Sequence, residues 1–352
     1  MAAEIAGEQD RRRRRPHVDR GGAIASVVGT LELLGEDRNR VKGVIFNKFR
    51  GDISLFQDAV RLTEEKTGVK VIGVMPWLSD IIIEGEDVMS INWNKKTASE
   101  TCGTINIGVV KFPRVSNHTD LEAFCFEPDV RIIETDASTH FGDLDAIILP
   151  GTKSTVLDMK YLEENGLADK IRKFSAKGGT VYGLCGGYQM LGKKIYDHNF
   201  KDNETIAEID GIGILPVITS FSDTKITQKR TGKIIHPYFK ADISVSGYEI
   251  HFGETTFTEA KDDFDSLFEL DGHKDGAANK NLSAAGSYLH NAFHNDNFRS
   301  IWLNNIRRAK GLPERDAADT TSAKEEAYNI LAAALIKNID MKYVAQNIMG
   351  LR

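Results

Sequence analysis

The sequence has few cysteines and no long apolar stretch, and each shortage excludes a class of protein. The 352-residue chain has three cysteines, Cys102, Cys125 and Cys185, which are too few and too scattered for a disulfide framework. None lies in a C-x-x-C pair or a Cys/His cluster with the spacing of a zinc site, so we expect no metal centre. The longest aliphatic run, Ile330 to Ile336, is far too short to span a bilayer, and the first thirty residues contain no apolar signal core. We therefore expect a cytoplasmic protein without a membrane partner.

Basic charge is also scarce. The 45 Lys and Arg residues face 51 Asp and Glu residues, which gives a net charge of -6, whereas nucleic-acid-binding proteins usually carry a basic domain or stripe. We expect no nucleic-acid partner. The exception is the run Arg11 to Arg15; we interpret residues 1–18 as a disordered, solvated tail, and a nucleic-acid or import role is the alternative. With 41% hydrophobic and 27% charged residues, the chain is long enough for about two globular domains.

The first hundred residues alternate between helical and strand patterns. Apolar residues recur at helical spacing between Gly21 and Gly35. The pattern then predicts a strand at Val41 to Asn47, an amphipathic helix at Ser54 to Thr67 and a strand at Val69 to Met75. Strands separated by helices indicate a parallel α/β sheet. The polar stretch from Asn92 to Gly103 is the expected linker to a second domain.

A second α/β pattern follows that linker. It predicts strands at 105–113, 130–134, 145–150 and 180–184, a helix at 169–176, a β-rich region at 211–254, a short last strand in "GSYLHNAF", and helices at 297–310 and 323–337. The fold class is therefore α/β in both parts of the chain.

The stretch "TVYGLCGGYQMLG" places Cys185 between glycines, where a predicted strand turns into a helix. This is the arrangement of a nucleophile elbow, in which a tight turn exposes the reactive side chain. The positive end of the helix would favour a thiolate. The N–H of Gly186 and that of Gly151, in the loop "ILPGTKST", are the expected oxyanion-hole donors. The alternative is that Cys185 is a small buried hydrophobic residue.

A cysteine nucleophile needs a base, and nine histidines are available. His290 and His251 both end short strands late in the chain. We favour His290 because it closes the last strand of the domain, about one hundred residues after the cysteine. We expect His251, together with Tyr188 and Gln189, near the substrate or behind the catalytic residues; a structural role for either histidine is the alternative.

Eight stretches together resemble one known family, the cobyric acid synthases, which are the glutamine-dependent amidotransferases of cobalamin synthesis. They run in the family's order from Asp19 to about Pro313: "DRGGAIASVVGTLELL", "VKGVIFNKFRGD", "GVMPWL", "IGVVKFPRVSNHTDLEAF", "DAIILPGTKST", "YGLCGGYQMLG", "GYEIHFGET" and "GSYLHNAFHNDNFR". The resemblance covers most of the chain.

The resemblance implies a fusion of two parts. Residues 19–103 are expected to form the C-terminal portion of a dethiobiotin-synthetase-like domain with a parallel sheet. Residues 104–312 are expected to form a class I glutamine amidotransferase-like, flavodoxin-like α/β domain, and 313–352 a helical extension. Cys185 and His290 match the family's catalytic pair. Asn291 replaces the glycine of the family's "GTYLHG" form, and Ala292 occupies the position where many class I enzymes have an orienting carboxylate, so no third member is assigned.

The N-terminal part of the family uses ATP and magnesium as co-substrates, with no permanently bound cofactor. Asp19 and Arg20 fall in its "DRGG" motif, and Asn47 and Lys48 in "NKFRGD" are expected near the nucleotide; a strand-end turn and a solvated lysine are the alternatives. The sequence contains no G-x-x-x-x-G-K-[ST] phosphate loop. We therefore expect a truncated or split enzyme that cannot perform the ATP step alone and needs a separate synthetase segment or a homo-oligomer.

The implied reaction hydrolyses L-glutamine and passes ammonia to a corrinoid. Four successive amidations would convert adenosylcobyrinic acid a,c-diamide into cobyric acid. Three alternatives stay open: an amidotransferase of the cobyrinic acid diamide synthase type, a cell-wall precursor amidase, and a non-catalytic remnant or regulatory subunit.

Overall fold

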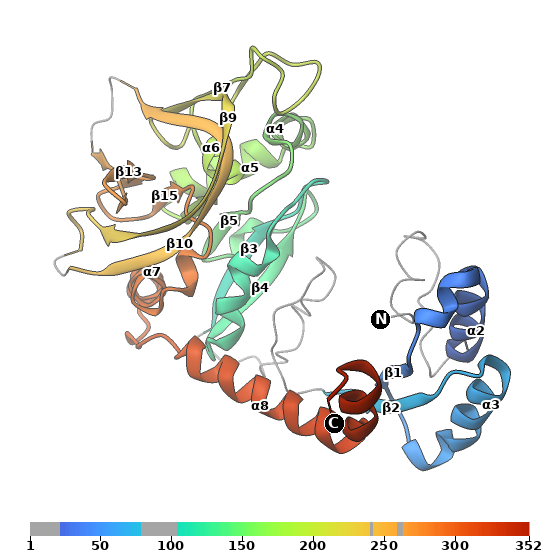
Figure 1. Ribbon diagram of the computed structural model, residues 1–352. Helices are drawn as coiled ribbons and strands as arrows, with labels where there is room; N and C mark the ends of the chain where they lie inside the picture. The colour runs from blue at the N-terminus through green and yellow to red at the C-terminus, as the bar shows by residue number, and fades with distance from the viewer. Residues whose placement is uncertain (1–21, 79–103, 240–241, 259–262, 352) are drawn as a thin grey trace. The chain divides into compact units, whose positions relative to one another are not determined.

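The computed structural model describes residues 22–78, 104–239, 242–258 and 263–351. The chain divides into two compact units (Figure 1): the first combines Met1–Ile83 with Ser322–Arg352, and the second is Glu84–Thr321. The expected tail at 1–18, Asp19 with Arg20, and the expected linker at 92–103 lie outside the described residues. The α/β fold class is confirmed in both units.

The first unit is built on two parallel strands, β1 (Val44–Phe49) and β2 (Val71–Pro76). The helices α2 (Ala23–Leu33) and α3 (Gln57–Thr67) contribute to it, and a short 3-10 turn at Ile53–Phe56 precedes α3. The core joins Val27 and Leu31 of α2 to apolar residues of both strands. Helix α3 ends at Gly68, whose φ of 66° is the left-handed cap that glycine adopts without strain. Both strands begin two to three residues and end one to two residues further along the chain than the sequence pattern predicted.

The C-terminal segment completes this unit. After α8 (Thr320–Asn338), Ile339 forms an antiparallel bridge to Gly73 of β2, and the Asp340 N–H donates to the Ile72 carbonyl over 2.7 Å. The Asp340 carboxylate also pairs with Lys70 at 2.6 Å. The sequence treated 313–352 as a separate extension, whereas the structure assigns residues from Ser322 onward to the first unit.

The second unit contains a seven-stranded sheet in the order β11-β14-β15-β6-β5-β3-β4. Five strands are parallel: β3 (Ile105–Val110), β4 (Val130–Thr135), β5 (Ala146–Leu149), β6 (Thr180–Leu184) and β15 (Ala284–Ser287). The short strands β14 (Ala277–Asn279) and β11 (Phe264–Asp265) extend it antiparallel.

Side chains of the parallel strands alternate between two cores. Ile148 of β5 packs with Phe298 and Trp302 of α7 (Asp296–Ala309), whereas its neighbours in β5, Ile147 and Leu149, pack with α4 (Thr155–Glu164) and α5 (Leu167–Ala176). Helices therefore cover both faces, as a buried parallel sheet requires. Helix α4 was not predicted from the sequence.

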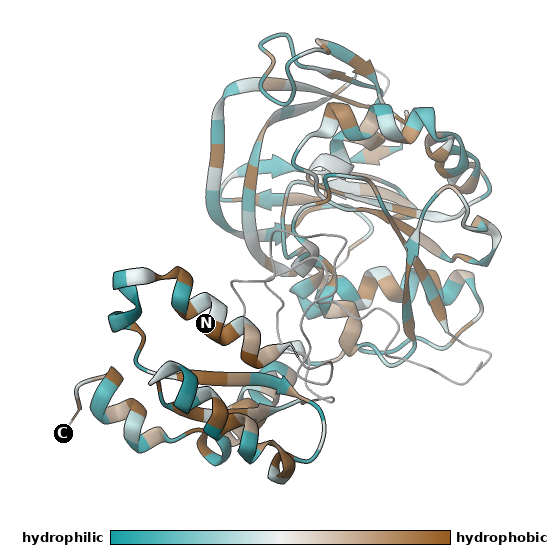
Figure 2. Cartoon of the chain, turned by 90° about the vertical axis from the view of Figure 1, so that its right-hand side faces the viewer, coloured by the Kyte–Doolittle hydropathy of each residue, from teal (hydrophilic) through white to brown (hydrophobic). Residues whose placement is uncertain are grey.

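A long two-stranded ribbon dominates the second sheet of this unit. Strands β9 (Val217–Ile234) and β10 (Ser244–Phe257) pair antiparallel, with a register shift between His251 and Gly253. The short strands β7 (Lys194–Tyr196), β8 (Glu208–Asp210), β12 (Phe268–Leu270) and β13 (His273–Asp275) complete the sheet. The ribbon is largely hydrophilic, whereas the parallel strands carry hydrophobic segments (Figure 2). The β-rich pattern predicted at 211–254 corresponds to this ribbon.

Candidate active site

Four parallel strands deliver candidate residues to one edge of the sheet. Cys185 directly follows β6, Gly151 follows β5 by two residues, and His290 follows β15 by three. Asp120 lies beyond β3 in the 3-10 segment η4 (His118–Phe126). The carboxyl edge of a parallel sheet is where α/β proteins usually place their ligand sites.

Cys185 occupies a strained turn. Its φ of 50° and ψ of −108° lie outside the regions that non-glycine residues prefer, and it directly precedes helix α6 (Gly186–Leu191). The approach of α6 to β5 requires glycine at 187, because a Cβ there would lie 2.1 Å from the Leu149 carbonyl oxygen. The Cys185 side chain is 8% exposed, and its Sγ lies 3.6 Å from the Ile250 carbonyl oxygen. The structure thus has the elbow geometry that the glycine pattern predicted.

His290 is held on one side by a carboxylate that the sequence did not reveal. Its Nδ1 lies 2.7 Å from Asp120 Oδ2, while Asp120 Oδ1 accepts a 2.7 Å hydrogen bond from the Asn291 N–H. Both side chains are buried, at 4% and 1% exposed. Since Asp120 engages Nδ1, Nε2 is left for Cys185. The sequence placed His290 at a strand end, but it lies beyond β15 and pairs with Tyr248 of β10 through two backbone hydrogen bonds.

The protonated form of His290 is strongly favoured. Burial lowers the pKa of His290, but hydrogen bonds to Asp120 and Cys185, together with their charges, outweigh it and raise the pKa to about 10. The imidazole ring is therefore linked to both the carboxylate and the cysteine. This is the connectivity of a nucleophile, a base and an orienting acid.

The two glycines expected at an oxyanion hole lie beside this pair. A Cβ on Gly151 would be 3.5 Å from His290 Cε1 and 3.7 Å from Cys185 Cβ, so its backbone lies against both residues. Gly186 is the first residue of α6, where an N–H has no intrahelical acceptor. The loop is fixed because the Ser116 N–H donates to the Gly151 carbonyl over 2.8 Å.

Tyr248 and Asn117 form a second support for His290 that sequence reasoning missed. The Tyr248 ring stacks on the imidazole with centroids 5.0 Å apart and an interplanar angle of 15°. The Asn117 side chain donates to the Tyr248 hydroxyl over 2.6 Å and lies 3.0 Å from His290 Nδ1. Only their positions in "SNHTD" and "GYEIHFGE", two of the stretches typical of the family, could have indicated them.

The remaining predicted residues of this unit lie around the elbow. His251 Nδ1 is 2.7 Å from the Gly253 carbonyl, its ring stacks on Tyr288, and burial lowers its pKa, so it is not in the position of the base. Gln189 is buried and bonded to Thr155 and Tyr288. Tyr188 packs in the core with its ring against Tyr288, behind the elbow.

Asn47 and Lys48 belong to the first unit, at the carboxyl end of β1. Asn47 Oδ1 accepts from the Lys48 N–H over 2.9 Å, and Lys48 has a φ of 60°, which is unusual for a residue with a long side chain. Both side chains are exposed. Among the residues that the structure describes, no group of three or more His, Cys, Asp and Glu side chains could hold a metal ion, and no helix is long and apolar enough to cross a bilayer.

A cysteine at a strand-to-helix elbow, linked to a histidine and a carboxylate on a parallel sheet, is the arrangement of a cysteine-dependent amidotransferase. Comparison with known families agrees. Residues 106–298, more than half of the chain, match the CobB/CobQ-like glutamine amidotransferase domain, and residues 2–90 match the CobQ/CobB/MinD/ParA nucleotide binding domain. The chain belongs to the CobB/CobQ-like glutamine amidotransferase family, which confirms the resemblance seen in the sequence.

Its relatives include curated cobyric acid synthases. The protein of Carboxydothermus hydrogenoformans is 39% identical over 341 residues, which cover 95% of this chain and 67% of that protein. Those of Geobacillus kaustophilus and Dehalococcoides mccartyi are 39% and 40% identical, with 94% and 93% of this chain and 64% and 65% of theirs covered. The chain thus spans about two thirds of the length of these relatives. A solved glutamine amidotransferase is 16% identical with a TM-score of 0.42, over 58% of this chain and 99% of its own.

Proposed function

We propose that this chain hydrolyses L-glutamine at Cys185 and releases ammonia, as the glutamine-using part of an amidotransferase of the cobyric acid synthase type. The observation that carries the proposal is the linked set of Asp120, His290 and Cys185 at the carboxyl edge of the sheet. The family match to a glutamine amidotransferase domain supports the choice of substrate.

In the first half of the reaction, Cys185 sulfur attacks the carboxamide carbon of glutamine and forms an S–C bond. The carboxamide oxygen becomes an oxyanion next to the N–H groups of Gly151 and Gly186. The C–N bond then breaks. His290, which is protonated below a pKa of about 10, gives the departing nitrogen its proton, so that ammonia leaves.

In the second half, the neutral His290 takes a proton from water. The resulting hydroxide attacks the thioester carbon, the S–C bond breaks and returns its electron pair to sulfur, and the new carboxylic acid loses its proton to solvent as glutamate leaves. Asp120 keeps the Nδ1 proton in place during both halves, so that Nε2 alone exchanges protons with the reacting atoms. The protonated His290 and the cysteine thiolate are then restored.

The proposed acceptor of the ammonia is a peripheral carboxylate of a corrinoid, adenosylcobyrinic acid a,c-diamide, which is the acceptor that the family resemblance implies; the relatives are named cobyric acid synthases. The nucleotide-binding family match covers residues 2–90 and implies ATP use. However, the sequence contains no glycine-rich phosphate loop of the G-x-x-x-x-G-K-[ST] type, so the residues present do not fit the phosphates. The steps given above therefore describe the hydrolysis of glutamine and no ATP-dependent step.

The test is glutamate release from L-glutamine by three forms of the chain. We expect Cys185→Ala to abolish release, whereas Cys125→Ala, which removes a half-buried thiol that is not part of the linked set, should retain the wild-type rate. Equal rates for wild type and Cys185→Ala would remove Cys185 from the mechanism. A second measurement adds ATP, magnesium and the corrinoid, and mass spectrometry should find no amidated product from this chain alone.

A further inference from the structure

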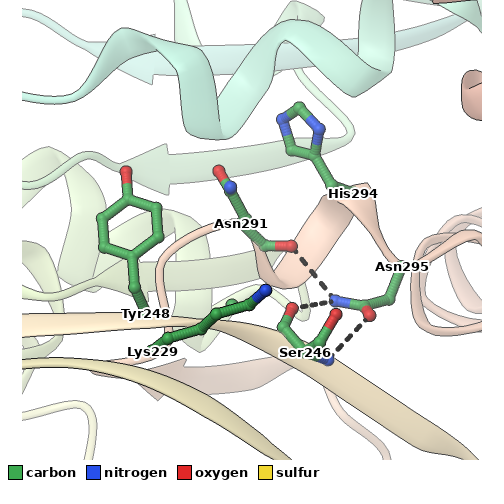
Figure 3. A pocket seen from close by; sticks show the side chains of 7 residues that line it. Lys229, Ser246, Tyr248, Asn291, His294 and Asn295 are labelled. Atoms are coloured by element: carbon green, nitrogen blue, oxygen red, sulfur yellow. Dashed lines mark hydrogen bonds between the residues drawn. The ribbon is translucent and has the colours of Figure 1, made fainter.

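A pocket of about 380 Å³ lies next to the catalytic histidine, and no step of the proposed mechanism uses it (Figure 3). One wall comes from the ribbon and the other from the segment that follows His290. Its lining residues are Lys229, Ser246, Gly247, Tyr248, Asn291, His294 and Asn295. Tyr248 belongs to both sites, because its ring also stacks on His290.

The lining contains one lysine and no acidic side chain. Lys229 lies opposite Tyr248 in the β9–β10 register, so both side chains share one face of the ribbon. Figure 3 shows the Lys229 side chain extending into the pocket toward Ser246 and Asn291. Within the described part of the chain, no carboxylate lies within 4.0 Å of its ammonium group. The next residue, Arg230, points to the other face and is paired with Glu249 at 2.6 Å. Glu249 of the ribbon therefore neutralises Arg230, whereas the charge of Lys229 is directed into the pocket.

The walls around Lys229 are fixed by hydrogen bonds. The Asn295 side chain accepts from the Ser246 N–H over 2.9 Å and donates to the Ser246 carbonyl over 3.0 Å and to the Asn291 carbonyl over 3.1 Å. Asn291 is in the left-handed region with a φ of 62°, and Asp120 holds its backbone N–H. A rigid wall with a hydroxyl and an amide beside a lysine suits an anion better than a cation.

We propose that this pocket binds a carboxylate, with Lys229 as its cation and the side chains of Ser246 and Asn291 as neutral hydrogen-bond donors. The inference rests on the proposed function, because a carboxylate bound next to His290 belongs to one of the two substrates of amidotransfer. It is either the α-carboxylate of glutamine or a peripheral carboxylate of the corrinoid. The position Asn291, where the family form has glycine, thereby contributes an amide to the pocket.

The experiment compares Lys229→Gln with Lys225→Gln. Lys225 lies on the same strand, over the ring of Phe252, but outside the pocket. If glutamine is the ligand, Lys229→Gln raises KM for glutamine in the glutamate-release assay by roughly 10-fold or more, with a smaller change in kcat. If the corrinoid is the ligand, KM stays constant, and the Kd of cobyrinic acid a,c-diamide rises by a similar factor. Lys229→Arg keeps the charge and should retain binding within a few-fold.

Two results would overturn the proposal. In one, Lys229→Gln changes neither the KM for glutamine nor the Kd of cobyrinic acid a,c-diamide. In the other, Lys225→Gln changes these constants as much as Lys229→Gln does. A binding measurement distinguishes failure of the carboxylate site from failure of the proposed function. L-Glutamate and the corrinoid are titrated into Cys185→Ala with and without Lys229→Gln, so that no turnover is needed. If glutamate release proves independent of Cys185 but binding still depends on Lys229, the function fails and the carboxylate site stands.

Discussion

Asp120 and His290 are 170 residues apart in the chain, yet Asp120 Oδ2 lies 2.7 Å from His290 Nδ1. The second oxygen of the same carboxylate accepts the N–H of Asn291, so Asp120 holds both the imidazole ring and the backbone that carries it. A carboxylate in this position fixes the tautomer of the histidine and stabilises its protonated form. We therefore propose that Asp120 is a positioning residue that acts through His290.

The first prediction concerns Asp120→Asn. The amide keeps the size of the side chain but can offer an N–H to Nδ1, which favours the tautomer that has its proton on Nε2. Glutamate release should therefore fall by roughly 100-fold or more, mainly in kcat. The matched control is Asp143→Asn, which changes an exposed aspartate that is paired with the exposed His140. An active Asp120→Asn variant would show that the carboxylate does not position His290.

The second prediction concerns pH. The pKa of His290 is raised from 6.5 to about 10 in the folded chain, so its protonated form stabilises the fold. This contribution is complete below pH 6.5 and is lost as the pH rises through 10. The free energy of unfolding of the wild type, measured relative to His290→Gln, should therefore decrease between neutral pH and pH 10. In Asp120→Asn, the hydrogen bond that raises the pKa of His290 most is gone, whereas burial still lowers this pKa. The decrease in the free energy of unfolding should therefore occur at lower pH. Parallel pH dependences in wild type and His290→Gln would contradict this assignment.

Much of the site could be read from the sequence, because the features that define it are local. The strand-turn-helix frame placed Cys185 and Gly186, and the loop after the preceding strand placed Gly151. Asp120 was missed because its contact is non-local: β6 and β5 separate β15 from β3 in the sheet, and it is the segment η4 beyond β3 that carries Asp120 to His290. The position two residues after His290, where many class I enzymes have a carboxylate, is occupied by Ala292, which is fully buried.

Non-local pairing also explains the differences in the fold. Residues 339–343 have no periodicity that distinguishes them, and their place in the first unit comes from an isolated bridge to Gly73 and the ion pair with Lys70. Similarly, His290 is held by Tyr248 on another strand and not by β15, so the alternation in "GSYLHNAF" extended the predicted strand too far. A pattern within one segment cannot show which distant backbone completes its hydrogen bonds.

The third prediction compares two glycines of the first unit. A Cβ on Gly73 would lie 2.6 Å from the Asn338 carbonyl oxygen and 3.0 Å from Ile339 Cα, and a rigid backbone cannot move aside easily. Gly73→Ala should therefore destabilise the docked C-terminal segment by about 1–3 kcal/mol. Gly29 lies inside α2 with no atom within 4 Å of a new Cβ, so Gly29→Ala should stabilise the unit by about 0.5–1 kcal/mol.

Hydrogen exchange of the β2 amides, followed by mass spectrometry, measures this unit without interference from the second one. Exchange should be faster in Gly73→Ala and slower in Gly29→Ala. If both substitutions slowed exchange, the bridge between Gly73 and Ile339 would not contribute to the stability of the unit.

The last prediction concerns the strain at Cys185. Its φ of 50° with a ψ of −108° is accessible to glycine but costs a residue with a Cβ about 1–3 kcal/mol. In Cys185→Ala the strain persists, whereas in Cys185→Gly it is relieved. The glycine variant should therefore have a free energy of unfolding about 1 kcal/mol higher than the alanine variant, although neither releases glutamate.

The same pair of substitutions at Lys160, an exposed position within α4, should give the opposite order, because glycine weakens a regular helix. Urea denaturation of all four variants measures both differences. If glycine were the less stable residue at both positions, the turn at Cys185 would not be strained, and the elbow would hold its nucleophile without a cost in stability.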